Sequence, residues 1–68
     1  MNPKPLLGSV WVFENNPKSH HFLLLEEKQA YYQDVEWDFE ALEIETGARS
    51  SVYFKKRARA YGGWEEDK

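Results

Sequence analysis

The sequence has 68 residues, no cysteine, 16% aromatic residues and a formal net charge of −3 at pH 7. This length allows one domain, and the lack of cysteine excludes disulfides and thiolate metal sites. So small a domain buries only about 60% of the surface that its unfolded chain exposes. We therefore expect aromatic side chains to dominate the core, and any that remain exposed to mark a partner site.

The first half of the chain predicts an extended lead-in followed by two strands. Residues 1–7 contain two prolines, which favour an extended backbone. Residues 8–14, GSVWVFE, are rich in β-branched and aromatic residues and end at a turn-forming segment. Residues 20–26, HHFLLLE, predict a second strand that is buried on both faces for part of its length. Residues 27–34, EKQAYYQD, are either a long hairpin loop or an extension of this strand.

Residues 35–45, VEWDFEALEIE, show the clearest strand pattern. Apolar and acidic residues alternate as far as Phe39, as in a half-buried strand. After Ala41 the apolar residues continue on the opposite parity, which predicts a β-bulge or a sharp bend at this point.

The last third of the chain predicts a turn, another strand and a closing element. Gly47 lies where a tight turn needs a positive φ. Residues 49–55, RSSVYFK, then form a strand that pairs back. Residues 61–64, YGGW, are a short closing strand or a single helical turn, and a helix after residue 54 is a further alternative.

These elements predict an all-β fold, a small five-stranded barrel over residues 8–64 followed by an acidic tail at 65–68. The pattern resembles the Src-homology-3-like small barrels found among short phage and bacterial accessory proteins. The resemblance rests on GSVWVFE at 8–14, on WDFEALEIETG at 37–47 and on SVYFKK at 51–56. It implies a binding or assembly role and no chemistry, because such barrels host many functions. The groove for proline-rich ligands is not carried over, because its acidic-aromatic loop signature is not recognisable here.

The charged residues are divided between two stretches. Residues 26–45 carry eight acids against the single cation Lys28, whereas residues 49–59 carry five cations and no acid. The net negative charge weakens the case for general nucleic-acid binding, but a local basic stripe is still able to bind a polyanion.

The basic stretch near the C-terminus has three interpretations. Its cations are Lys55, Lys56, Arg57 and Arg59. In an extended backbone they could make three or four phosphate contacts, each adding about 0.7–0.9 to the salt slope of log K, while Tyr61 and Trp64 stack on bases. The same residues could instead protect a sheet edge and close the barrel, or form a patch for a protein partner. We favour the edge or packing role, then the protein partner, then nucleic acid.

A row of acids lies on one face of the strand at 35–45. Glu36, Asp38 and Glu40 are spaced by two, or roughly 6.5–7 Å, which overlaps the separation of paired carboxylates in inverting glycosidases. A barrel this small has little enclosed volume to raise the pKa of one of them, so a solvated polar face is favoured. The row could also pair with Arg49 or Lys55 across strands, or dock onto a basic partner.

Catalytic, metal and cofactor sites are not expected. His20 and His21 are adjacent on a predicted strand and point to opposite faces, so they cannot readily chelate one ion. The serines lack a nucleophile-elbow context, and no glycine-rich phosphate loop is present. The chain also has no segment near the roughly 18 apolar residues of a membrane span and no apolar run of a signal peptide, which predicts a cytoplasmic protein.

The sequence thus predicts a non-enzymatic protein-interaction module, and the resemblance implies a phage or bacterial accessory protein. Nucleic-acid binding through residues 55–59 is the alternative, and homo-oligomeric assembly through a strand edge is the second alternative. The candidate partner-binding residues are Lys55, Lys56, Arg57, Arg59, Tyr61, Trp64, Glu36, Asp38 and Glu40.

Overall fold

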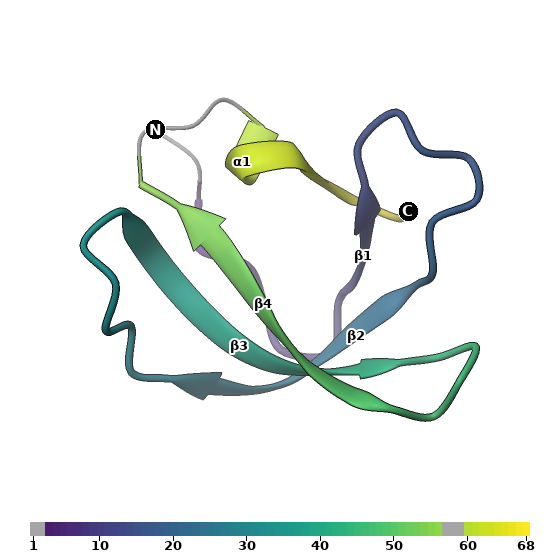
Figure 1. Ribbon diagram of the computed structural model, residues 1–68, viewed down its shortest axis with the longest axis horizontal. Coiled ribbons are helices and arrows are strands. Elements are labelled where there is room, and N and C mark those ends of the chain that lie inside the picture. The colour runs from purple at the N-terminus through teal and green to yellow at the C-terminus, as the bar shows by residue number, and fades with distance from the viewer. Residues whose placement is uncertain (1–2, 57–59) are drawn as a thin grey trace.

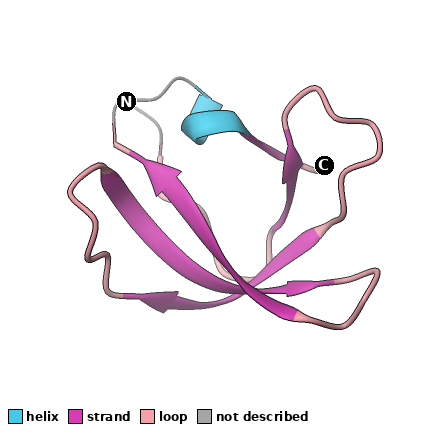
Figure 2. Cartoon of the chain, in the orientation of Figure 1, coloured by secondary structure: helices cyan, strands magenta, loops and turns pink. Residues whose placement is uncertain are grey.

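The computed structural model describes residues 3–56 and 60–68. Over these residues the chain is mostly β, with little helix (Figures 1 and 2). Its elements are β1 (Val10–Phe13), β2 (Phe22–Lys28), β3 (Val35–Glu43), β4 (Arg49–Lys55), α1 (Ala60–Gly63) and β5 (Trp64–Glu66). The predicted all-β class and the five strands are confirmed.

The strands form one antiparallel sheet in the order β4-β3-β2-β1-β5. The sheet curls into a U, and α1 lies across its opening, between β4 and β1 (Figure 1). No ladder joins β4 to β5 among the described residues, so the sheet is not closed into a barrel. The physical reason is that β5 has only three residues and α1, which contacts both β4 and β5, stands between them.

Two β-bulges interrupt the sheet, and one of them lies opposite Ala41, on the partner strand and not in β3 as the sequence predicted. One interrupts β2 between Leu24 and Glu26, and the other is at the start of β3, opposite β4. The predicted change of parity after Ala41 is wrong, because Ala41 is buried on the same parity as Phe39 and the extra residue lies in β2. The prediction counted Ile44 as a buried strand residue. Ile44 instead lies in the turn after β3 and is exposed, so it does not show which face of the strand is buried.

The core is an aromatic cluster inside the U, as the composition predicted. Its buried members are Trp11, Phe22, Leu24, Phe39, Ala41, Val52, Phe54 and Trp64. Phe54 is central: its ring meets those of Trp11, Phe39 and Tyr61 edge to face, with centroids 5.0, 5.7 and 5.5 Å apart. Each such pair contributes about 0.5–1.5 kcal/mol beyond the area that it buries, which helps to stabilise so small a domain.

The segment before β5 is a helical turn with an unusual backbone. Tyr61 and Gly62 have φ of 57° and 78°, so α1 is not a regular helix. β5 then continues to Glu66 and pairs with β1, so Glu65 and Glu66 belong to the sheet rather than to an acidic tail. Gly47 has φ of 77°, which confirms the predicted turn between β3 and β4.

The stretch at 27–34 was predicted to be either a hairpin loop or an extension of the preceding strand, and the structure shows part of each. β2 extends to Lys28, and residues 29–34 form the loop that leads into β3. None of the helical residues that the structure describes belongs to a helix long and apolar enough to cross a membrane.

Candidate functional site

The described part of the basic stretch lies beside the β2–β3 loop. Lys55 ends β4, and its Nζ donates a hydrogen bond to Oδ2 of Asp34 at 2.8 Å. The backbone N–H of Lys56 donates to the carbonyl oxygen of Asp34, also at 2.8 Å. Arg57 and Arg59 lie outside the described residues. The loop and the end of β4 are therefore held together at Asp34.

Two tyrosines of this loop are the most exposed aromatic side chains that the structure describes. Tyr31 is 81% exposed and Tyr32 is 60% exposed. The ring of Tyr32 meets that of Tyr53 on β4 edge to face, with centroids 5.6 Å apart. Packing on Tyr53 thus fixes one of the two loop tyrosines while leaving most of its ring in solvent.

These tyrosines and three lysines form what we call the tyrosine–lysine surface. Tyr53 aligns across the sheet with Asp38, and Asp38 aligns with Lys28 at the end of β2. Lys28 Nζ donates to Ser51 Oγ at 3.3 Å, which keeps its charge on the same side of the sheet. The surface consists of Lys28, Tyr31, Tyr32, Tyr53, Lys55 and Lys56.

The electrostatics of this surface are set by one carboxylate at its edge and one beneath it. The hydrogen bond from Lys55 holds the pKa of Asp34 below its usual range, so Asp34 stays ionised beside that lysine. Asp38 is only 5% exposed, and its Oδ1 has no hydrogen-bond partner among the described residues. A buried carboxylate without a partner is costly.

The predicted acidic row is therefore not a solvated row. Asp38 is buried, and Glu36 lies half-buried at the bulge that opens β3. Glu40 is paired with Arg49 of β4, as the cross-strand alternative predicted. Lys55, the other predicted partner of the row, pairs with Asp34 instead. The bulge and the neighbouring strands give these three acids three different surroundings.

Tyr61 and Trp64 were predicted to stand near the cations, but they belong mainly to the core. Trp64 is 9% exposed and stacks on Phe13, with centroids 4.4 Å apart. Tyr61 is half-buried against Trp11 and Phe54, and its hydroxyl donates to the carbonyl oxygen of Pro3 at 2.8 Å. Trp64 therefore closes the core, as the packing interpretation proposed, instead of offering its face to a base.

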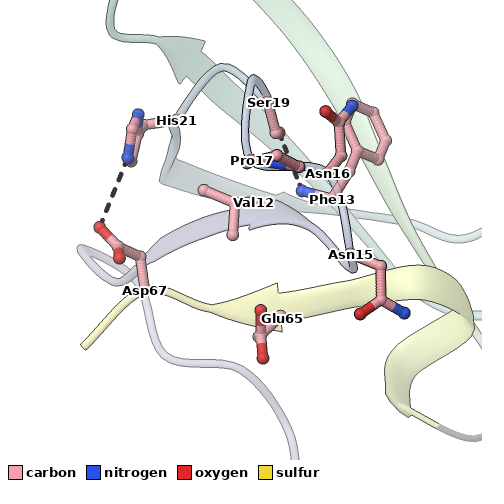
Figure 3. Close-up of a pocket in the computed structure, with 9 residues that line it drawn as sticks. All are labelled: Val12, Phe13, Asn15, Asn16, Pro17, Ser19, His21, Glu65 and Asp67. Atoms are coloured by element: carbon pink, nitrogen blue, oxygen red, sulfur yellow. Dashed lines mark hydrogen bonds and ion pairs between the residues drawn. The ribbon is translucent and has the colours of Figure 1, made fainter.

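A hollow of about 440 Å³ lies between β1, the β1–β2 loop and β5 (Figure 3). Phe13, Asn15, Asn16 and Glu65 line it, and His21 faces Asp67 at its edge. The Nε2 atom of His21 is 3.6 Å from Oδ2 of Asp67. The lining mixes polar side chains with Val12, Phe13 and Pro17, and both ring nitrogens of His21 face carboxylates.

The two histidines pair with two carboxylates at the end of the β3–β4 hairpin. His20 Nδ1 is 2.5 Å from Oε1 of Glu43, and His21 Nδ1 is hydrogen-bonded to Oε2 of Glu45. The latter bond raises the pKa of His21. Hydrogen bonds from the backbone and the ring of His21 lower the pKa of Glu45 to about 2. Within residues 3–56 and 60–68 no group of three or more His, Cys, Asp or Glu side chains is arranged to hold a metal ion.

Tyr31 and Tyr32 are the candidate site residues that sequence reasoning missed. The signal was present, because two adjacent aromatics in the polar segment EKQAYYQD cannot both face one core. No protein-family model matches the sequence, and neither the curated proteins nor the solved structures contain a match.

Proposed function

We propose that this chain is a non-enzymatic protein-interaction module and that the tyrosine–lysine surface is its contact. The observation that carries the proposal is the exposure of Tyr31 and Tyr32, in a protein whose tryptophans are buried or half-buried. Tyrosine is enriched at protein interfaces, because it supplies a large contact area at a low cost in conformational entropy.

The charges of the surface favour an acidic partner. Lys28 and Lys55 are held beside the tyrosines by their bonds to Ser51 and Asp34, and exposed Lys56 follows Lys55. The carboxylate of Asp34 at the edge is already paired with Lys55. Rim charges of this kind steer association and set specificity more than they add affinity. An acidic protein surface that presents apolar or aromatic groups to the tyrosines fits this arrangement.

The proposal includes a Src-homology-3-like fold and an accessory role of the kind found in phage and bacteria. The strand order, the long β3–β4 hairpin and the helical turn before β5 support this fold. In such a scaffold the loops present the contact residues while the sheet holds them in place.

The test is a pull-down from nuclease-treated lysate with the wild type and with a Tyr31→Ser/Tyr32→Ser variant. The matched control is Leu6→Ser/Leu7→Ser, which removes two exposed apolar side chains from another part of the chain. We expect a partner, identified by mass spectrometry and rebuilt from purified proteins, to bind the wild type and the leucine variant. It should bind the tyrosine variant at least tenfold more weakly, since tyrosine is enriched among the hot-spot residues whose truncation costs about 2 kcal/mol or more. Equal binding by all three proteins would contradict the proposal.

Nucleic-acid binding by the same surface is the second candidate, because exposed tyrosine rings beside lysines suit base stacking and phosphate contact. A single-stranded oligonucleotide titrated at several salt concentrations separates the two. If Lys55 and Lys56 contact phosphates, log K falls against log salt with a slope of about 0.7 per contact. The double variant Lys55→Gln/Lys56→Gln should then reduce that slope, whereas a protein complex keeps its affinity in moderate salt.

A further inference from the structure

A second hollow, of about 520 Å³, lies beside α1 and β5 and takes no part in the proposed function. Its walls combine aromatic and acidic side chains. The aromatic members are Trp11, Tyr61 and Trp64, and the acidic members are Glu14, Glu65 and Glu66. We call it the acidic aromatic hollow.

The aromatic floor is rigid. Trp11 and Tyr61 meet edge to face with centroids 4.8 Å apart, and the hydroxyl of Tyr61 is tied to the carbonyl oxygen of Pro3. Trp11 and Trp64 are buried, so the ring surface that faces solvent comes chiefly from half-buried Tyr61. The left-handed backbone of Tyr61 is rare for an aromatic residue. It persists because these contacts hold the ring in place.

The rim is strongly negative. Glu66 aligns with Trp11 across the β1–β5 ladder, and Glu14 follows β1, so the sheet brings these two acidic residues to the hollow. Glu65 aligns with Val12, and its side chain lies at the first hollow (Figure 3). Lys68 is the one cation among the described lining residues. The pKa of Tyr61 is raised by burial and, to a smaller extent, by the charge of Glu66.

We propose that the acidic aromatic hollow binds a cationic side chain of a partner protein, arginine in the first place. A cation over an aromatic face is attracted by the ring electrons. The guanidinium group also stacks on rings and pairs with carboxylates in a planar, two-pronged geometry that an ammonium group cannot match. The charge of this site is opposite to that of the tyrosine–lysine surface. The chain therefore has two contact sites of opposite charge, one for an acidic and one for a basic segment.

The direct test is an NMR titration with three capped tripeptides, Gly-Arg-Gly, Gly-Lys-Gly and Gly-Gln-Gly. The indole N–H signals of Trp11 and Trp64 report on the hollow, and that of Trp37, which does not line it, is the internal reference. We expect a saturable shift of the first two signals with the arginine peptide, a weaker effect with the lysine peptide and none with the glutamine peptide. Shifts of equal size with the glutamine peptide, or no saturable shift with arginine, would overturn the proposal.

Two double variants with the same net charge then test whether the acidic residues of the hollow bind the arginine. Glu14→Gln/Glu66→Gln should weaken arginine binding by roughly fivefold or more, as expected for two exposed carboxylates. Glu26→Gln/Glu36→Gln changes the net charge equally, outside the hollow, and should leave the affinity within about twofold. Equal weakening by both variants would mean a general charge effect and would refute the site. The Tyr31→Ser/Tyr32→Ser variant should bind the arginine peptide normally, so the two proposed sites succeed or fail independently.

Discussion

The side chain of Glu45 receives two hydrogen bonds from His21. Oε1 accepts the backbone N–H of His21 at 2.7 Å, and Oε2 is bonded to Nδ1 of the imidazole. Because His21 precedes β2 and Glu45 follows β3, this pair fastens the β3–β4 hairpin to the neighbouring strand. Asp67 approaches the other ring nitrogen of His21 at 3.6 Å, so a third segment, the one after β5, joins the same cluster.

The His21–Glu45 pair predicts a pH window of stabilisation. The raised pKa of His21 stabilises the fold below 6.5 and this contribution is lost as the pH rises through the folded-state value. The lowered pKa of Glu45 stabilises the fold above 4.5 and this contribution is lost as the pH falls towards about 2. The stabilisation is therefore greatest between pH 4.5 and 6.5.

The measurement is urea unfolding from pH 2 to 9 of the wild type and of His21→Gln. We expect the difference in unfolding free energy to be largest inside this window and to shrink on both sides. His20→Gln is the matched control, since it removes the adjacent imidazole and its bond to Glu43 but leaves the His21 cluster in place. A difference between wild type and His21→Gln that is the same at every pH would contradict the assignment.

Asp38 predicts a stabilising substitution. Its carboxylate is buried with an unpaired Oδ1, and an amide of the same shape costs less to remove from water than a charge. Asp38→Asn should therefore raise the unfolding free energy by about 1–2 kcal/mol in urea denaturation. Glu40→Gln is the contrasting variant, because it breaks a partly exposed ion pair with Arg49 and should cost no more than about 1 kcal/mol. A loss of stability in Asp38→Asn would show that the charge itself is needed, with Lys28 as the nearest candidate partner in the register.

Replacing Gly47 should lower the unfolding free energy through backbone conformation alone. A Cβ atom at this position meets nothing within 4 Å, but the φ of 77° disfavours every residue with a Cβ. Gly47→Ala should lower the unfolding free energy by about 1–2 kcal/mol. Ala48→Gly, the reverse change at the next residue, should have a smaller effect. A loss well above 2 kcal/mol would imply a steric clash, and no loss would imply that the turn changes its conformation.

The sequence was most informative where one strand face is buried and the other is not. The strand at 49–55 was predicted with its observed bounds, because Val52 and Phe54 alternate with polar residues. The closing strand was placed at residues 61–64 instead of 64–66, because glutamate is a poor strand former, yet pairing with β1 overrides that preference. Burial of Asp38 could not be read from the chain, since it depends on the alignment of β3 with Lys28 and Tyr53.

The candidate sites could also be predicted only in part from the sequence. Adjacent tyrosines in a polar loop were visible in the sequence, but their proximity to Lys55 follows from contacts at Asp34. The acidic aromatic hollow combines Glu14 with residues some fifty positions later, and only the β1–β5 pairing brings them together. Local sequence patterns therefore indicated which kinds of side chain are exposed. Which of these side chains lie together depends on pairing between distant strands.

The hydroxyl of Tyr61 predicts how the N-terminal lead-in is held. It donates to the carbonyl oxygen of Pro3 at 2.8 Å, a contact between residues 58 positions apart. Tyr61→Phe keeps the ring on Trp11 and removes only this bond, so the unfolding free energy should fall by about 0.5–1.5 kcal/mol. Amide hydrogen exchange at Gly8, whose N–H donates to the carbonyl oxygen of Leu24 at 2.8 Å, should become faster at the same time, because the lead-in loses a tether.

The matched control for this prediction is Tyr31→Phe. Tyr31 is largely exposed, and its hydroxyl makes no hydrogen bond with any residue that the structure describes, so this variant should be as stable as the wild type. If Tyr61→Phe is also neutral and leaves the exchange of the lead-in unchanged, then packing of the Tyr61 ring alone holds the left-handed turn. In that case Tyr61→Leu, which keeps an apolar side chain but loses both the hydroxyl and the aromatic face, should still destabilise the fold by more than 1 kcal/mol, as expected for a core aromatic of roughly this burial.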